Sequence, residues 1–149
     1  MSVLSCREEK QVETENVPAT AKKVLETPFQ FLLALPDYEA TALTHDSDMF
    51  STWGELALSR RSDSDTLRMK AREELLKSAK QAGWTTAKDL PNLEPSDLNR
   101  YGVRHAEEDL EIAQSVSLKG QNPPTRYGCR LWISEDGRRI VVVYRVDGE

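Results

Sequence analysis

The sequence feature that most constrains the fold is the last part of the chain, residues 126–149, which predicts a β-hairpin residue by residue. Its centre is the dipeptide Asp136-Gly137, which suits a two-residue hairpin turn because such turns require positive φ angles. Valine, isoleucine and aromatic residues flank this turn, as is typical of strands. Pairing across the turn places Glu135 opposite Arg138, Ile133 opposite Ile140, Leu131 opposite Val142, Cys129 opposite Tyr144 and Tyr127 opposite Val146.

The predicted pairing gives the hairpin two faces of different character. One face is apolar except for an opposite-charge pair at the turn, and we expect it to pack against the core. The other face carries a tryptophan and two valines among arginines, and tryptophan and arginine are enriched where proteins bind one another. This second face is either an exposed partner-binding surface or a part of the core that helices cover. The candidate partner-binding residues on it are Trp132, Arg130, Val141, Val143, Arg139 and Arg145.

Much of the chain before the hairpin has the hydrophobic spacing of helices. The longest predicted helix runs from about Thr66 to Ala82, where leucine and alanine recur at three- and four-residue intervals and Gly83 follows as an end signal. Prolines near helix starts predict shorter helices at residues 18–25 and 27–35. The side chains expected in the core are Phe29, Phe31, Leu32, Leu33, Leu35, Met49, Trp53, Leu56, Leu67, Leu75, Leu110, Leu131, Ile133, Ile140, Val142 and Tyr144.

The predicted fold class is α+β: a mainly helical domain of about five helices, closed by a C-terminal antiparallel β-hairpin and winged-helix-like in its order. We expect a loop at residues 36–48, and helices around residues 49–57, 86–90, 95–101 and 104–114. Residues 115–119 alternate in polarity, so they either end the last helix or add a third strand to the hairpin. Residues 1–17 are expected to form a flexible polar tail, and residues 18–149 a single domain.

Charge and composition narrow the class of protein. Charged residues make up 30% of the chain and hydrophobic ones 38%, and no apolar run approaches the roughly 18 residues that span a bilayer. The first ten residues lack the apolar core of a signal peptide, so we expect a cytoplasmic protein without membrane contact. The net charge is −5, and neither half of the chain concentrates the positive charge of nucleic-acid binders. This balance favours another protein as the partner and disfavours nucleic acid.

The leading hypothesis is a small, non-enzymatic binding or regulatory protein, an adaptor that acts through protein–protein contacts. Its positive support is the face of the hairpin that carries tryptophan and arginine. The segment from Leu93 to Val103 also resembles part of the sterile-alpha-motif domains, which are helical interaction modules, and this resemblance implies protein binding. A bacterial or phage accessory factor would suit the size of the chain. Neither the identity of the partner nor an oligomeric state follows from the sequence.

An alternative hypothesis is a winged-helix regulator that binds nucleic acid. A long helix, a short helix, a turn, a further helix and a hairpin follow one another in the predicted order, as in that class of DNA-binding domain. The helix beginning at Pro95 would enter the major groove, although Glu94 and Asp97 would lie close to phosphate groups and weaken binding. Under this hypothesis the nucleic-acid-binding residues are Asn99, Arg100, Arg138, Arg139 and Arg145.

A third hypothesis is a small metal-dependent hydrolase around His45, Asp46 and Asp48. Histidine and aspartate are metal ligands, but a site needs further ligands, and no H-x-x-x-H, C-x-x-C or E-x-x-H spacing is present. Helix capping explains Asp46 better. Cys129 lies on the apolar face of the hairpin, where burial would raise its thiol pKa and make it a poor nucleophile. We therefore expect no catalytic residue, no metal and no cofactor, and we expect Cys6 and Cys129 to be free thiols.

Overall fold

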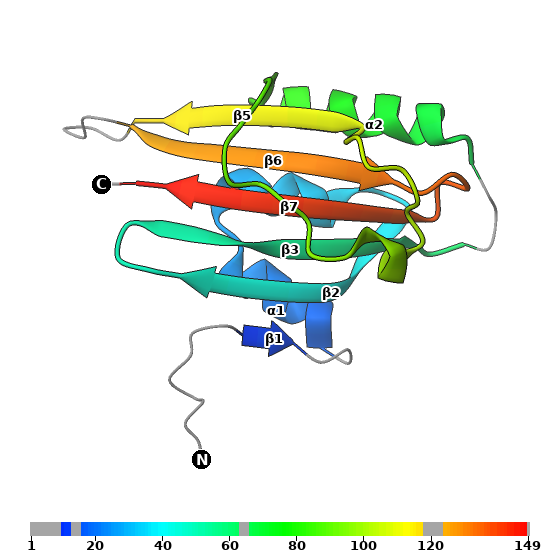
Figure 1. Cartoon of the computed structure of the whole chain (residues 1–149), viewed down its shortest axis with the longest axis horizontal. Coiled ribbons are helices and arrows are strands. Elements are labelled where there is room, and N and C mark those ends of the chain that lie inside the picture. The colour runs from blue at the N-terminus through cyan, green and yellow to red at the C-terminus, as the bar shows by residue number, and fades with distance from the viewer. Residues whose placement is uncertain (1–9, 13–15, 63–65, 118–123, 149) are drawn as a thin grey trace, which may run out of the picture.

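An antiparallel sheet of seven strands, formed by the residues that the structure describes, is the central element of the computed structural model (Figure 1). The described residues are 10–12, 16–62, 66–117 and 124–148. The strands lie in the order β1-β2-β3-β7-β6-β5-β4, and every neighbouring pair is antiparallel. Their bounds are β1 (Lys10–Val12), β2 (Tyr38–Ser47), β3 (Ser51–Arg60), β4 (Thr85–Thr86), β5 (Leu110–Val116), β6 (Thr125–Ile133) and β7 (Arg139–Asp147).

The prediction of a mainly helical domain with about five helices is wrong, because strands replace most of the expected helices. The helices in the described part of the chain are α1 (Val17–Val24), η3 (Thr27–Ala34), α2 (Arg68–Gln81) and η4 (Leu98–Tyr101), of which η3 and η4 are 3-10 helices. The winged-helix-like order is wrong as well, since residues 86–90 and 104–109 are not helical and residues 110–116 form β5. No helix among the described residues is long and apolar enough to cross a membrane.

The C-terminal hairpin and the long helix are confirmed. β6 and β7 pair in the predicted register, with Tyr127 opposite Val146. The turn differs in one detail: in the expected dipeptide only Gly137 has a positive φ, of 72°, and its N–H donates to the carbonyl oxygen of Ser134 at 2.9 Å. A third strand, β5, does pair with β6, but only residues 115 and 116 of the segment that the sequence left open belong to it, and residues 110–114 were expected to be helical. Residues 118 and 119 of the segment 115–119 lie outside the described part of the chain. Residues 1–9 of the expected tail, which include Cys6, lie outside it as well.

Two strands form where a loop and a helix were expected. β2 and β3 make a hairpin that spans most of residues 38–60. A shift of register between Ala40 and Ala42 marks a bulge in β2, so its buried residues do not alternate regularly along the sequence. In β3, Leu56, Ala57 and Leu58 are all buried, because both faces of the sheet are covered there. Neither strand therefore has the simple alternation that predicts a half-buried strand.

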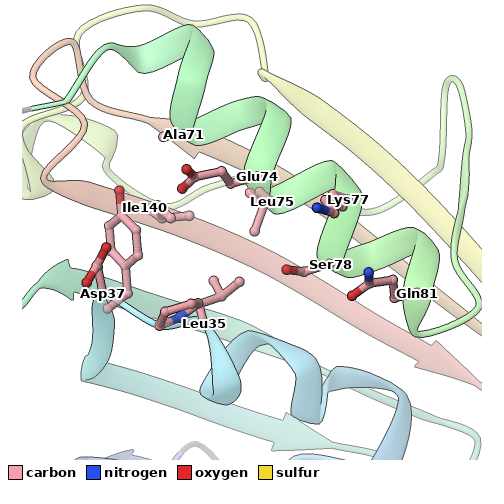
Figure 2. Close-up of a pocket in the computed structure, with 11 residues that line it drawn as sticks. Leu35, Asp37, Ala71, Glu74, Leu75, Lys77, Ser78, Gln81 and Ile140 are labelled. Carbon is pink, nitrogen blue, oxygen red and sulfur yellow. The ribbon is translucent and has the colours of Figure 1, made fainter.

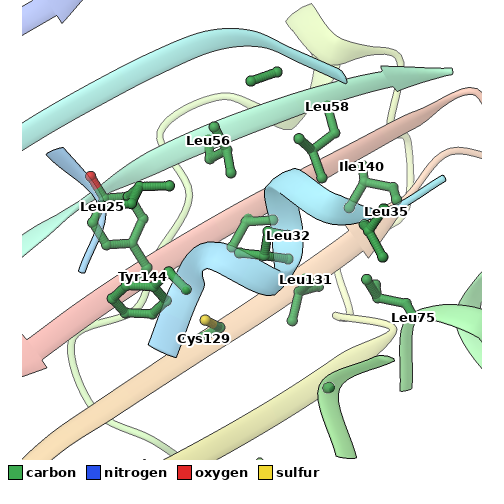
Figure 3. Close-up of a cluster of buried hydrophobic side chains, with 14 of the residues drawn as sticks. Leu25, Leu32, Leu35, Leu56, Leu58, Leu75, Cys129, Leu131, Ile140 and Tyr144 are labelled. Carbon is green, nitrogen blue, oxygen red and sulfur yellow. The ribbon is translucent and has the colours of Figure 1, made fainter. Parts of the chain in front are cut away.

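Helices α1, η3 and α2 cover one face of the sheet and enclose the main hydrophobic core (Figures 1 and 3). Leu32 of η3 and Leu75 of α2 point into this core (Figure 3). Most of the predicted core residues are buried, but Met49 and Leu67 are exposed, because one lies in the turn between β2 and β3 and the other precedes α2. Cys129 is buried, and its burial raises the pKa of the thiol well above its usual range.

An irregular segment, residues 87–109, crosses the opposite face of the sheet, and we call it the strap (Figure 1). It contributes Leu93, Tyr101 and Val103 to a second buried cluster, which packs on Trp132 and its neighbours in the sheet. Apart from η4, the strap has no helix. The segment that resembles the sterile-alpha-motif domains is thus an extended covering of the sheet and not a helical module.

Candidate protein-binding surface

The strap covers the tryptophan face that the sequence offered as a partner-binding surface. Trp132 is 2% exposed, and its indole Nε1 donates to the carbonyl oxygen of Ala106 at 3.0 Å. Val141 and Val143 are buried in the same cluster. The structure therefore shows the alternative that the sequence left open, in which Trp132 belongs to the core. The covering element is the strap, whereas helices were expected.

The arginines of the predicted surface are separated from one another by the strap. Arg130 lies beneath it: its Nε donates to the carboxylate of Glu111 at 3.2 Å, and its Nη2 donates to the carbonyl oxygen of Leu90 at 2.7 Å. Arg139 and Arg145 lie towards opposite ends of β7. The predicted set is therefore not one surface, and the two ends of the sheet present different groups.

The end of the sheet near Arg145 carries a second tryptophan, Trp53 of β3, which the sequence analysis assigned to the core. The two residues lie opposite each other in the pairing of β3 with β7, and the guanidinium carbon of Arg145 is 5.4 Å from the centre of the Trp53 ring. A cation over an indole face is a favourable contact, so each side chain helps to position the other. Trp53 is only partly buried. No spacing in the sequence links β3 with β7, so this pair becomes visible only in the folded sheet.

The turn between β2 and β3 extends from the same end of the sheet and carries two exposed apolar side chains. Met49 is 85% exposed and Phe50 is 62% exposed. Asp48 orders the turn, because its Oδ1 accepts the backbone N–H groups of Phe50 and Ser51, both at 2.8 Å. These hydrogen bonds hold the pKa of Asp48 below its usual value. The N–H of Gly148 donates to the carbonyl oxygen of Phe50 at 3.1 Å, so the turn is also attached to the end of β7.

A recess of about 280 Å³ lies between this end of the sheet and the strap. Leu90 and Leu93 of the strap form an apolar wall, while Arg126 and Arg145 also line the recess. Gly128 of β6 lets the strap pack closely on the sheet beside the recess, because a Cβ there would lie 3.1 Å from Cδ1 of Leu90 and 3.5 Å from Cδ1 of Leu93. The recess is large enough to receive one apolar side chain of another molecule.

The two arginines beside this recess differ in their partners. Nε of Arg145 donates to both carboxylate oxygens of Asp147, at 3.1 and 3.2 Å, and its Nη2 donates to the hydroxyl of Ser51 at 3.2 Å. The exposed side chain of Arg126 has no hydrogen bond or ion pair within residues 10–12, 16–62, 66–117 and 124–148. Its guanidinium group is therefore available to an acidic group on another molecule. We call the following residues together the hairpin-tip surface: Met49, Phe50, Trp53, Arg126 and Arg145.

A second recess, of about 350 Å³, lies on the helical side of the sheet, between α2 and the residues that follow η3 (Figure 2). Leu35, Leu75 and Ile140 are its buried, apolar lining. Glu74 and Gln81 of α2, which are polar, are exposed, and the hydroxyl of the buried Tyr38 already donates to the carbonyl oxygen of Gly137. A specific ligand pocket needs polar groups that are placed inside it to orient the ligand. Because its polar groups are either at least partly exposed or, in Tyr38, already bonded within the protein, this recess is better explained as a gap in the packing of α2.

The residues of the nucleic-acid hypothesis are divided between the two ends of the sheet. Asn99 and Arg100 lie in η4, and Arg100 lines a small pocket together with Arg138 and Arg139. Arg145 lies at the other end of β7. η4 is a single 3-10 turn within the strap, so it cannot enter a major groove as a recognition helix does.

The residues of the hydrolase hypothesis each have a local structural contact. Nδ1 of His45 lies 2.6 Å from the hydroxyl of Tyr144, Asp46 accepts the N–H of Ser47, and Asp48 orders the turn that follows β2. Among the residues that the structure describes, no three or more His, Cys, Asp or Glu side chains gather in a group that could hold a metal ion.

Comparison with protein families, with curated proteins and with solved structures finds no match to this chain. A function for the chain must therefore be argued from its own geometry. At the hairpin-tip surface, that geometry combines exposed apolar side chains, a tryptophan in contact with an arginine, and an available guanidinium group.

Proposed function

We propose that this protein is a binding module that engages another protein through the hairpin-tip surface. The observation that carries the proposal is the presence, at one end of the sheet, of the exposed Met49 and Phe50 beside the Trp53–Arg145 pair. Methionine, aromatic residues and arginine are the types enriched at protein interfaces. The sequence led to the same class of function, but the residues that we now propose for it differ, and only Arg145 belongs to both sets.

In this proposal, the recess beside Gly128 receives a side chain of the partner, and the apolar residues of the turn are covered by the partner. A partner can insert one apolar side chain into the recess, which Leu90 and Leu93 wall. Interfaces commonly place such an anchoring residue in a pocket that other contacts shield from water. Covering Met49 and Phe50 removes two large apolar side chains from water, which is worth about 1.5–3 kcal/mol for each when the burial is complete.

The charges at this end of the sheet indicate the chemistry of the partner. Arg145 already donates to Asp147, so its charge is largely compensated. Arg126 has no such partner among the described residues, and a carboxylate placed beside it would form a strong, charge-assisted hydrogen bond. We therefore expect the partner to present an apolar side chain next to an acidic one.

The experiment that tests this proposal compares two variants that make the same kind of change at opposite ends of the protein. Phe50→Asp places a charge on the hairpin-tip surface. Met69→Asp places one in the first turn of α2, where Met69 is 61% exposed, nearly as much as Phe50. Wild type and both variants are immobilised and used to capture partners from an extract of the native host. Mass spectrometry then quantifies the captured proteins, and nucleic acid is measured in the same eluates.

We expect wild type and Met69→Asp to capture the same discrete protein in similar amounts. Phe50→Asp should capture at least about tenfold less of that protein. Arg126→Glu should weaken capture as well, because it opposes an acidic partner. All variants should keep the melting temperature of the wild type, since the substituted side chains are exposed. Equal capture by the two Asp variants would contradict the proposal, and so would specific capture of nucleic acid in place of a protein.

A further inference from the structure

We propose that a small pocket lined by three arginines, at the end of the sheet opposite the hairpin-tip surface, binds a phosphate monoester group. The pocket has a volume of about 260 Å³. It lies where η4 of the strap meets the turn between β6 and β7, and it brings together Arg100, Arg138 and Arg139 (Figure 1 shows η4 and this turn at the same end of the sheet). We call it the arginine pocket. The proposal is independent of protein binding at the other end.

Two of the three guanidinium groups are available to a ligand. The guanidinium carbon of Arg100 lies 4.9 Å from the centre of the Tyr101 ring, which holds the charge at the pocket. Within the described part of the chain, the side chains of Arg100 and Arg139 form no hydrogen bond or ion pair, and both residues are exposed. Cations that share a pocket without a counter-charge repel one another, and an anion bound between them removes this cost.

The third arginine and the one carboxylate of the pocket lie in the same turn. Oδ1 of Asp136 accepts the hydroxyl of Ser134 at 2.7 Å and the backbone N–H of Arg138 at 3.0 Å. These hydrogen bonds, together with the nearby charge of Arg138, hold the pKa of Asp136 below its usual value, so it is an anion at neutral pH. The negative charge of Asp136 balances the positive charge of Arg138. The positive charges of Arg100 and Arg139 are then available to a ligand.

This arrangement matches a phosphate monoester in charge and in shape. A monoester carries about −1.5 to −2 charges at pH 7, which two arginines can balance. The planar fork of each guanidinium group donates two parallel N–H bonds to phosphate oxygens. A phosphodiester carries a single charge and would leave one arginine without a counter-charge. A pocket of about 260 Å³ also admits a phosphate with a small attached group, but not a nucleic-acid duplex.

The strap fixes one side of the arginine pocket before a ligand arrives. Oδ1 of Asp97 accepts the N–H of Asn99 at 3.2 Å at the start of η4, and Gly102 ends η4 in the left-handed conformation with a φ of 81°. Tyr101 is buried in the cluster around Trp132, so the backbone of the preceding Arg100 is anchored to the sheet. A site with a fixed backbone loses less conformational freedom when it binds, which favours affinity.

The test is a calorimetric titration of the whole chain with glycerol 2-phosphate, at constant ionic strength. Dimethyl phosphate is the matched diester probe. Arg100→Gln and Arg139→Gln each remove one of the available charges. Arg126→Gln removes an equally exposed charge from the hairpin-tip surface and is the control. Circular dichroism melting checks that all three variants fold.

We expect saturable binding of glycerol 2-phosphate that is about tenfold weaker in Arg100→Gln and in Arg139→Gln and unchanged in Arg126→Gln. Vesicles with and without phosphatidic acid identify the source: tighter binding to the acidic vesicles than to the soluble probe assigns the phosphate to a lipid, and the reverse assigns it to a soluble compound. Equal weakening in Arg126→Gln, equal affinity for dimethyl phosphate, or binding of neither probe nor vesicle would overturn the proposal.

Discussion

Glu111 of β5 and Arg130 of β6 lie opposite each other in the sheet and together attach the strap to it. The carboxylate of Glu111 accepts Nε of Arg130 at 3.2 Å and also the backbone N–H groups of Asp89 and Leu90. Arg130 in turn donates to the carbonyl oxygen of Leu90. Asp89 has a positive φ of 60°, which is uncommon for a residue with a side chain, so this attachment also holds a strained backbone.

Removal of the Glu111 carboxylate should destabilise the protein strongly. We expect Glu111→Ala to lower the free energy of unfolding by about 3–5 kcal/mol, because Arg130 then lies charged in a largely buried position and two backbone N–H groups lose their acceptor. Urea denaturation followed by tryptophan fluorescence measures the change. Glu94→Ala is the control, since its exposed carboxylate lies 3.8 Å from Arg130 and should contribute little. Similar losses in both variants would show that Glu111 does not attach the strap.

Trp132 should contribute to stability as a core residue. We expect Trp132→Ala to lower the free energy of unfolding by about 3–5 kcal/mol, because it leaves a cavity beneath the strap and frees the carbonyl oxygen of Ala106. Trp53→Ala makes the same chemical change at a partly exposed site and should cost clearly less. Denaturation of the two variants under the same conditions provides the comparison. A smaller loss in Trp132→Ala than in Trp53→Ala would contradict the burial of Trp132.

The tyrosines should make the protein sensitive to alkaline pH. Burial raises the pKa of all four, and that of Tyr127, which also lies beside the carboxylate of Glu26, is raised to about 12. A pKa that is higher in the folded state stabilises the fold below the unfolded value of 10.0, and this contribution is lost as pH rises through the folded value. Stability should therefore fall between pH 10.0 and about 12.

Urea denaturation across this pH range, combined with ultraviolet absorbance of tyrosinate, checks the prediction. Tyr127→Phe should make the fall in stability shallower, because one of the groups that ionise late is removed. Ionisation of all the tyrosines near pH 10.0 in the folded protein would contradict it.

Gly54 of β3 should tolerate no side chain. A Cβ at this position would collide with the carbonyl oxygen of Thr44 and lie 2.6 Å from the hydroxyl of Tyr144, which itself donates to that carbonyl at 3.0 Å. We expect Gly54→Ala to lower the free energy of unfolding by about 1–3 kcal/mol, the usual cost of overpacking. Gly148→Ala, where the nearest atoms are 3.7 Å away, should be nearly neutral. Thermal melting of both variants tests this, and equal melting temperatures would contradict the close packing at Gly54.

The parts of the fold that could be predicted are those with local signals. The β6–β7 hairpin has its turn and both strands within two dozen residues, and α2 has its spacing and the following Gly83 in one segment. The prediction of a helix at residues 49–57 is wrong because Met49, Trp53 and Leu56 recur at helical spacing, although a sheet covered on both faces accepts the same residues. The strap was mistaken for helices because its contacts with the sheet are distant in sequence.

The same reasoning explains which site residues could be found. The sequence grouped Arg100, Arg138 and Arg139 as one cationic set, and the structure brings these three to one pocket, although in a different fold and without a recognition helix. The hypothesis also included Arg145, although the predicted strand already separates Arg145 from Arg139 by about 20 Å, at about 3.3 Å for each residue of a strand. One cause explains why the sequence assigns Trp53 to the core and proposes Trp132 for the partner-binding surface. The burial of each side chain depends on a covering segment that the sequence does not place.

The order of the strands has a consequence for how the chain acquires its structure. β3 pairs with β7, so residues 51–59 form their hydrogen bonds with residues 139–147. While the chain is being synthesised, the edge of β3 in the β2–β3 hairpin therefore stays unpaired until β7 has emerged. Pairing between such distant segments slows folding, and an open edge invites association with other chains in the meantime. The arrival of β7 in the middle of the sheet is the event that ends this exposure.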